Sequence, residues 1–300
     1  MPRYSRDQVR RRRRTLAGCC ALLVIGVLVL TVSCTIRAVR DGDPVPPEAA
    51  ATAAVPTAEV RVADAEAMTV PGTPADAPAL AQLPEGAALE QGEVMGIDVS
   101  SHQGTVDWTA VAADGYAFTY IKATEGSGYT DPMFAINWEG AGAAGLTRGA
   151  YHYFTLCSSG ADQARDFLAA APPDDAALPP ALDLEFDGAC QERPEADQAQ
   201  AEIDDFTRIV EAAWGRRVVV YSSSQWRAHY GLPVADSRPA WLFEDDGRPE
   251  DPEWAIWQLR FDGTVGGIGR PTDVDVLRID VLREHSVLTD EERTQLATTS

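Results

Sequence analysis

The sequence predicts an α/β domain over residues 91–283, in the form of an irregular TIM-like (β/α) barrel. Two observations favour this fold class. Short runs rich in β-branched and aromatic residues alternate with helical patterns, and there are enough such runs to close a barrel. The eight predicted strands cover residues 94–99, 117–122, 149–154, 180–185, 217–221, 240–243, 255–258 and 273–277.

Helical patterns separate the early strands. One covers 132–144 and ends before Gly145, a second covers 161–171, and a third covers 196–214 and ends at Gly215. The last three strands follow one another with little room for helices, which makes the predicted barrel irregular.

The N-terminus predicts a membrane anchor. Arg10–Arg14 precede an uncharged run that begins at Thr15, so we expect residues 1–14 in the cytoplasm and residues 15–34 as a transmembrane signal-anchor. Everything that follows would be extracytoplasmic, in a single-pass protein of the cell membrane. A cleaved signal peptide, with a secreted product, and a lipoprotein modified at Cys34 are the alternatives.

Two further segments lack a sustained apolar period. Residues 35–90 are rich in Ala, Pro and acids, which predicts a disordered linker between the membrane and the barrel. Residues 284–300 are expected to form a polar C-terminal tail.

The charge of the chain excludes one class of partner. The formal net charge is −21 over the whole chain and −29 over residues 41–300, and so acidic a body repels nucleic acid phosphates. The spacing of the five cysteines does not resemble a zinc site, so we expect no metal. We also expect no cofactor, and we expect the protein to be a monomer. Only Cys157 and Cys190 lie in the barrel segment, where an oxidising compartment would allow one disulfide.

The candidate site lies at the ends of the predicted strands, because barrels of this kind carry their active residues there. In Leu182-Asp183-Leu184-Glu185 the two carboxylates share one face of a strand, with Cα atoms about 6.5 Å apart. Two acids held so close cannot both ionise easily, and one can then supply a proton near neutral pH. The other polar or aromatic residues at strand ends are Asp98, Lys122, Tyr151, Tyr153, Tyr221, Trp241, Gln258 and Asp273.

Carboxylates together with aromatic rings suit a sugar substrate, because the rings stack on sugar faces and the acids transfer protons. Less specific interpretations stay open: Asp98 as a turn former, Lys122 in a salt bridge with Glu125, and His152 as a packed structural residue. Neither a G-x-S-x-G nor an H-x-x-x-H motif supports a serine or zinc hydrolase.

In their order along the chain, these motifs resemble those of the muramidase lysozymes of glycoside hydrolase family 25. The resemblance covers about residues 94–280 and rests on Gly96-Ile97-Asp98-Val99-Ser100-Ser101-His102-Gln103-Gly104, Asp107-Trp108, Tyr120-Ile121-Lys122-Ala123-Thr124-Glu125-Gly126, Gly149-Ala150-Tyr151-His152-Tyr153-Phe154, Asp183-Leu184-Glu185, Trp257-Gln258 and Gly266-Gly267-Ile268 leading to Asp273.

The resemblance implies a barrel of eight strands and about five helices. It also implies hydrolysis of the β-1,4 bond between N-acetylmuramic acid and N-acetylglucosamine in the glycan strands of peptidoglycan. By motif, Glu185 matches the catalytic acid and Asp183 its partner carboxylate, while Asp98 and Asp273 match the acids of the first and last strands. The residues that fall where the family lines its groove are Lys122, Tyr151, Tyr153, Tyr221, Trp241 and Gln258.

Two departures from the family pattern bear on these assignments. The last motif reads Thr272-Asp273-Val274-Asp275, which leaves Asp275 as a rival to Asp273. After Trp241, the residues Leu242-Phe243-Glu244 differ from the usual family pattern. Cys157 and Cys190 follow neighbouring strands, so a disulfide between them would brace the loops beside the acids. A wall-binding barrel without turnover and a glycosidase for another polysaccharide are the alternative functions.

Overall fold

The computed structural model describes residues 60–64, 66–231 and 238–298. The predicted cytoplasmic segment and the predicted anchor at 15–34 lie outside these residues. Within the described part of the chain, no helix combines the length and the apolar character needed to span a membrane.

The predicted barrel is confirmed. Eight strands close on themselves, because β1 pairs with both β9 and β2, and the two-residue β3 adds a short hairpin to β2 outside the ring. All barrel strands run parallel except β9, which is antiparallel to both neighbours. The strands are β1 (Glu93–Val99), β2 (Phe118–Glu125), β3 (Tyr129–Thr130), β4 (Thr147–Tyr153), β5 (Ala181–Leu184), β6 (Val219–Ser222), β7 (Ala240–Phe243), β8 (Trp254–Gly263) and β9 (Thr272–Arg278).

The helices exceed the expected number of about five. The described residues contain seven α-helices and two short 3-10 helices: η1 (Pro78–Gln82), η2 (Ser101–Gln103), α2 (Trp108–Ala113), α3 (Phe134–Ala143), α4 (Gly160–Ala170), α5 (Ala196–Trp214), α6 (Ser224–Tyr230), α7 (Ile279–Ser286) and α8 (Asp290–Thr298). The three helices predicted from periodicity correspond to α3, α4 and α5, and α5 ends where Gly215 adopts a left-handed backbone.

Alternation along the strands builds two apolar cores. Side chains on one face fill the barrel, where the rings of Tyr120 on β2 and Trp241 on β7 meet across the interior with centroids 5.0 Å apart. Side chains on the other face, such as Ile121 and Leu182, pack under the surrounding helices, whose own contribution includes Phe167 and Phe206. The interior is therefore packed below the mouth, and the polar strand ends remain at one rim.

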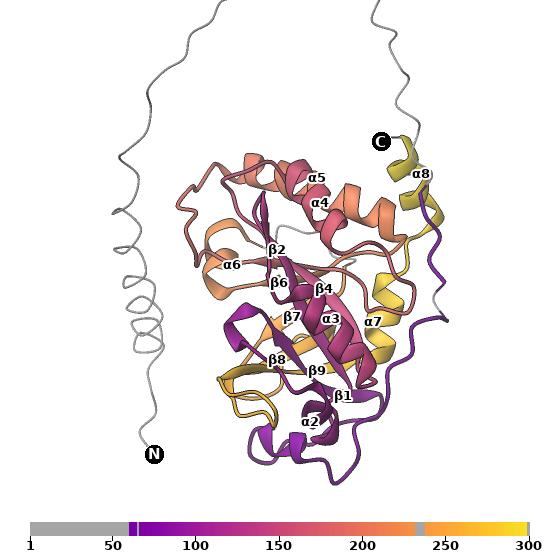
Figure 1. Ribbon diagram of the computed structural model, residues 1–300. Coiled ribbons are helices and arrows are strands. Elements are labelled where there is room, and N and C mark those ends of the chain that lie inside the picture. Colours follow the sequence, from indigo (N-terminus) through magenta and orange to yellow (C-terminus); the bar gives the residue numbers. More distant parts are fainter. Residues whose placement is uncertain (1–59, 65, 232–237, 299–300) are drawn as a thin grey trace, which may run out of the picture. The chain divides into compact units, whose positions relative to one another are not determined.

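The expectation of a disordered linker up to residue 90 is corrected for residues 60–64 and 66–90. Figure 1 shows this segment in indigo, running along the outside of the barrel past α7 to the start of β1. Met68 is 2% exposed and joins the interior core, while its carbonyl accepts a hydrogen bond from Arg283 on α7. The hydroxyl of Thr73 accepts from the backbone amide of Met95, 2.8 Å away. Buried apolar side chains and satisfied backbone groups hold the segment in place, although it has no periodic pattern.

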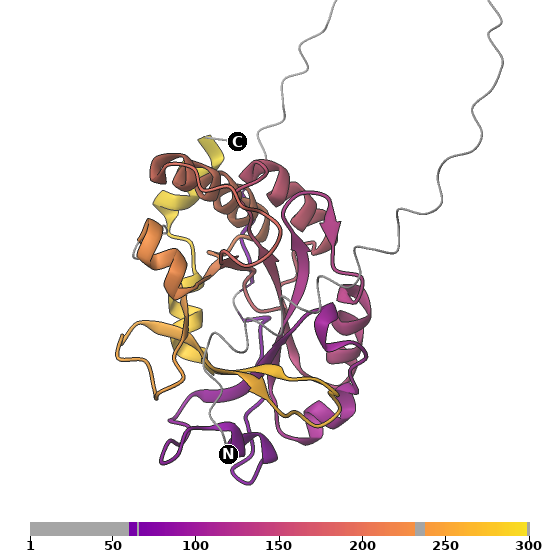
Figure 2. The ribbon, with the colours of Figure 1, turned by 90° about the vertical axis from the view of Figure 1, so that its left-hand side faces the viewer.

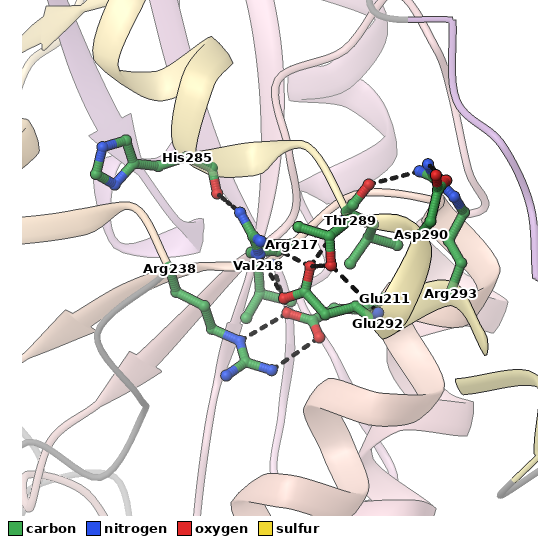
Figure 3. A network of polar contacts seen from close by, with 10 residues as sticks. Glu211, Arg217, Val218, Arg238, His285, Thr289, Asp290, Glu292 and Arg293 are labelled. Carbon is green, nitrogen blue, oxygen red and sulfur yellow. Dashed lines mark hydrogen bonds and ion pairs between the residues drawn. The ribbon is translucent and has the colours of Figure 1, made fainter. Parts of the chain in front are cut away.

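The C-terminal segment expected as a polar tail contains α8 and is held by charge. Arg217, just before β6, donates to both carboxylate oxygens of Glu292 at 2.7 and 2.6 Å (Figure 3). Its backbone amide donates to the carbonyl of Ser286. Beside it, Arg238 forms a bidentate pair with Glu211 of α5 at 2.7 and 2.8 Å. The sequence did not predict this helix, because its composition is polar and it is held by ion pairs rather than by an apolar stripe.

Candidate active site

The strand register gathers the predicted residues at one end of the barrel. Asp98 lies opposite Asp273, and Tyr153 lies opposite Asp183, which in turn lies opposite Tyr221. The direction of β9 explains the place of Asp273. Asp273 lies near the start of β9, as in the predicted strand 273–277, and because β9 is antiparallel its start lies at the same rim as the ends of the parallel strands.

Asp183 is a carboxyl group whose ionisation this arrangement strongly disfavours. Burial raises its pKa well above the ordinary value, and Glu185, Asp98 and Asp273 raise it further, whereas Lys122 lowers it. Among the described residues its Oδ1 atom is buried without a hydrogen-bond partner. Asp183 therefore does not ionise freely beside Glu185, as expected for two acids placed two residues apart.

Asp98 is oriented by a side chain from the next strand but one. The side-chain amide of Gln258 on β8 donates to Asp98 Oδ2 at 3.1 Å, although β9 separates the two strands. The loop that follows is fixed as well: Asp131 accepts hydrogen bonds from the backbone amides of Ser101 and Met133, each at 2.9 Å. Asp98 is therefore an oriented member of the acid cluster, and the helix capping in this region falls to Ser100 and Asp107.

Three tyrosines stand among the acids. Burial raises the pKa of Tyr151 well above its usual value, and so do Asp98, Asp183 and Asp273. Burial likewise raises the pKa of Tyr221 and of Tyr153, with Glu185 as the next cause for both. These hydroxyl groups stay protonated, so they can donate hydrogen bonds to a sugar or to a carboxylate.

Lys122 forms the salt bridge with Glu125 that the less specific interpretation predicted, and it also lies beside the acids of the rim. Its ammonium group pairs with Glu125 at 2.6 Å and lies 4.6 Å from the centre of the Tyr153 ring. It is 7% exposed and lies close enough to lower the pKa of Asp183. A salt bridge and a place in the site are compatible here.

Trp241 lies deeper than an exposed groove residue. It is 4% exposed, its ring contacts Tyr221 at 5.9 Å between centroids, and its indole N–H donates to Asp275 Oδ1 at 3.1 Å. The ring therefore belongs to the floor of the mouth, under the acids.

Asp275 is a feature that the sequence interpretation treated only as a rival to Asp273. The two acids face the same side of β9, but Asp275 is fully buried one layer below, and burial followed by Asp273 raises its pKa well above normal. The alternation Asp273-Val274-Asp275 could have indicated this stacking, given the strand direction.

Two other expectations are settled by geometry. Cys157 and Cys190 form a disulfide, with Cα atoms 5.8 Å apart, so that prediction is confirmed. His152 is fully buried between Thr124 and Gln163, at 2.7 and 3.0 Å, and burial lowers its pKa to about 4. It is a neutral structural residue, as the less specific interpretation held.

The described residues offer little for a metal ion. One group of three acids is close enough to share an ion, and all three are exposed at the end of β7: Glu244, Asp245 and Asp246. Exposed acids of this kind are common without an ion, and we assign them no ligand.

A barrel whose rim gathers several carboxylates, one with a raised pKa, among protonated tyrosines has the composition of a glycoside hydrolase site. Comparison with known proteins agrees. The model of the glycosyl hydrolases family 25 matches residues 97–268, and the chain belongs to that family.

Individual relatives support this membership. The chain is 34% identical over 194 residues to Lysozyme M1 of Streptomyces globisporus, covering 60% of this chain and 66% of that protein. An N,O-diacetylmuramidase of a Chalaropsis species is 36% identical over 143 residues, covering 44% of this chain and 67% of its own.

Solved structures share the fold. A family 25 glycosyl hydrolase from Bacillus anthracis matches with a TM-score of 0.59 at 28% identity, over 64% of this chain and 91% of that one. The bacterial lysozyme from Streptomyces coelicolor matches with a TM-score of 0.55 at 30% identity, over 70% of this chain and 99% of its own.

Proposed function

We propose that this chain is a muramidase that hydrolyses the β-1,4 bond between N-acetylmuramic acid and N-acetylglucosamine in peptidoglycan. The observation that carries the proposal is the convergence of Asp98, Asp183, Glu185 and Asp273 on one rim, with the pKa of Asp183 raised. Family membership and relatives named lysozyme and N,O-diacetylmuramidase support the choice of substrate.

The mechanism assigns one proton transfer to Glu185. It protonates the leaving oxygen while positive charge develops on the sugar ring. Asp183 and Glu185 share one proton, and when it lies on Glu185 the Asp183 carboxylate either orients the N-acetyl group of the substrate as an internal nucleophile or stabilises the cation directly. Asp98, held by Gln258, and Asp273 tune the charge of the pair, and their proximity is part of the cause that raises the pKa of Asp183.

Replacing Glu185 tests this assignment. Glu185→Gln keeps the shape of the side chain but removes the transferable proton, so we expect release of reducing ends from purified peptidoglycan to fall at least 100-fold with folding intact. Glu139→Gln, the same chemical change at an exposed position on α3, serves as the control and should keep full activity.

Mass spectrometry of the fragments from the native digest identifies the bond that is cut. Fragments that end in reducing N-acetylmuramic acid are expected. Binding to the wall without cleavage would favour a wall-binding barrel, and cleavage of another polysaccharide alone would favour the third candidate. Full turnover by Glu185→Gln would refute the assigned role.

We further propose that the barrel acts outside the cell, held at the membrane by residues 15–34. The disulfide between Cys157 and Cys190 supports an oxidising compartment, and the arginine-flanked apolar run supports the anchor. Peptidoglycan is then within reach of the site.

A further inference from the structure

The loop that follows the proposed catalytic acid is fastened at several points. It covers residues 186–193, begins directly after Glu185 and leads into α5. A loop of this length without secondary structure would ordinarily leave the preceding side chain free to move. Here two contacts from the β4 side and a set of contacts within the loop itself restrain it.

Two of these contacts come from the β4 side. The hydroxyl of Tyr153 donates a hydrogen bond to the carbonyl of Asp187, and the disulfide joins Cys190 to Cys157. Between them, Gly188 has a φ of 110°, a backbone conformation that side chains other than glycine rarely adopt. The loop thus turns sharply over the Tyr153 ring.

The contacts within the loop come from Arg193 at its far end. Its Nη2 donates to the carbonyl of Phe186 at 3.2 Å, and its Nη1 donates to the carbonyl of Cys190 at 3.3 Å. Its guanidinium also lies 4.0 Å from the centre of the Phe186 ring. A planar guanidinium can hold two carbonyls and cover a ring at once, which a lysine ammonium cannot do.

Phe186, the residue next to Glu185, is also held by α6. Its ring packs against Trp226 of α6 with centroids 4.9 Å apart, and Trp226 is 1% exposed. Phe186, the residue after Glu185, is therefore held on its carbonyl by Arg193 and on its side chain by both Arg193 and a buried tryptophan. Glu185, Phe186, Arg193 and Trp226 also line the same small cavity.

We propose that Arg193 is a positioning residue for Glu185: by binding the carbonyls of Phe186 and Cys190 and covering the Phe186 ring, it fixes the backbone from which the acid projects. The proposal rests on the proposed function, because it concerns the placement of the proton donor. A displacement of about 1 Å in a reacting group can lower the rate by as much as 100-fold.

The test compares Arg193→Ala and Arg193→Lys with the native chain on soluble glycan strands prepared from peptidoglycan. Both variants are expected to lower kcat about tenfold while KM stays within twofold, because the acid is misplaced but the groove is unchanged. Arg165→Ala, at an exposed arginine of α4 whose partner Asp162 lies on the same helix, is the control and should match the native kcat.

Four results would overturn the proposal. These are a kcat for Arg193→Ala within twofold of native, full recovery of kcat by Arg193→Lys, a rise in KM at constant kcat, and loss of folding in both variants by thermal denaturation. Recovery by lysine would mean that the positive charge alone matters, and a change in KM would mean direct contact with substrate. Because the native chain is assayed first, an inactive native enzyme would count against the proposed function and not against the role of Arg193.

Discussion

At the scale of single residues, the buried acid Asp183 lowers the free energy of unfolding of the protein. Asp183 is buried beside Glu185, and its Oδ1 atom has no hydrogen-bond partner among the described residues. An acid whose pKa is raised by folding weakens the folded state once the pH exceeds its ordinary pKa, because ionisation is harder in the native protein than in the unfolded chain.

Asp183→Asn should therefore inactivate the enzyme and stabilise it. The neutral amide removes the unfavourable charge next to Glu185, so the thermal midpoint should exceed that of the native chain at pH 7. The sign follows from the raised pKa: the difference should be near zero below about pH 4 and should grow as the pH rises toward the folded pKa.

Differential scanning calorimetry across pH 3.5 to 8 measures this difference. Asp246→Asn is the control. It makes the same chemical change at an exposed acid and should leave the midpoint unchanged. A lower midpoint for Asp183→Asn at pH 7 would show that the carboxylate makes a favourable contact.

At the scale of elements, α8 depends on Glu292. This carboxylate accepts from Arg217 at 2.7 and 2.6 Å, from the backbone amide of Thr289 at 2.7 Å and from its hydroxyl at 2.8 Å. These hydrogen bonds favour the ionised form and outweigh the effect of burial, so the pKa of Glu292 falls from 4.5 to about 2.

Glu292→Gln should lower the free energy of unfolding by about 1 kcal/mol at pH 7, the scale of a partly exposed ion pair. A lowered pKa gives stability that is present above the unfolded pKa and lost as the pH falls through the folded one. The gap between native and variant should therefore close between about pH 4.5 and 2. Urea unfolding measures it.

Glu291→Gln is the matched control, because Glu291 is the exposed neighbour in the same first turn of α8. It should differ little from the native chain. Equal losses in both variants would mean that general charge on α8, rather than the contact with Arg217, holds the helix.

At the scale of the whole molecule, the boundary of the folded part lies earlier than composition suggests. The segment before β1 buries Met68 in the barrel core and Ala79 in the outer core, and Arg61 pairs with Asp175 at 2.9 Å. Full burial of one side chain of this size contributes roughly 1.5–3 kcal/mol, so the segment belongs to the stability of the barrel.

Chains of three lengths test the proposed membrane anchor separately from the fold. The full chain should fractionate with membranes and be open to protease from outside, whereas a chain begun at Val60 should be soluble and keep native activity. A chain begun at Glu93 should lose at least about 3 kcal/mol of unfolding free energy, because Met68 and Ala79 are gone. Equal stability of the two truncated chains would contradict the structural role of residues 60–92.

The sequence determined the barrel and brought most of the candidate residues to one rim. Periodicity gave the eight strands and the helices α3, α4 and α5, and the strand-end rule placed Asp98, Asp183 and Glu185 at one rim, because the 2.0 and 3.6 residue periods are local properties of the chain. Only the tertiary structure decided the direction of β9, which puts Asp273 at the rim and Asp275 beneath it, and the packing of residues 60–64 and 66–92 and of α8. These features depend on partners distant in sequence, such as Asp98, Met95 and Arg217, and no local pattern encodes which distant group a side chain will meet.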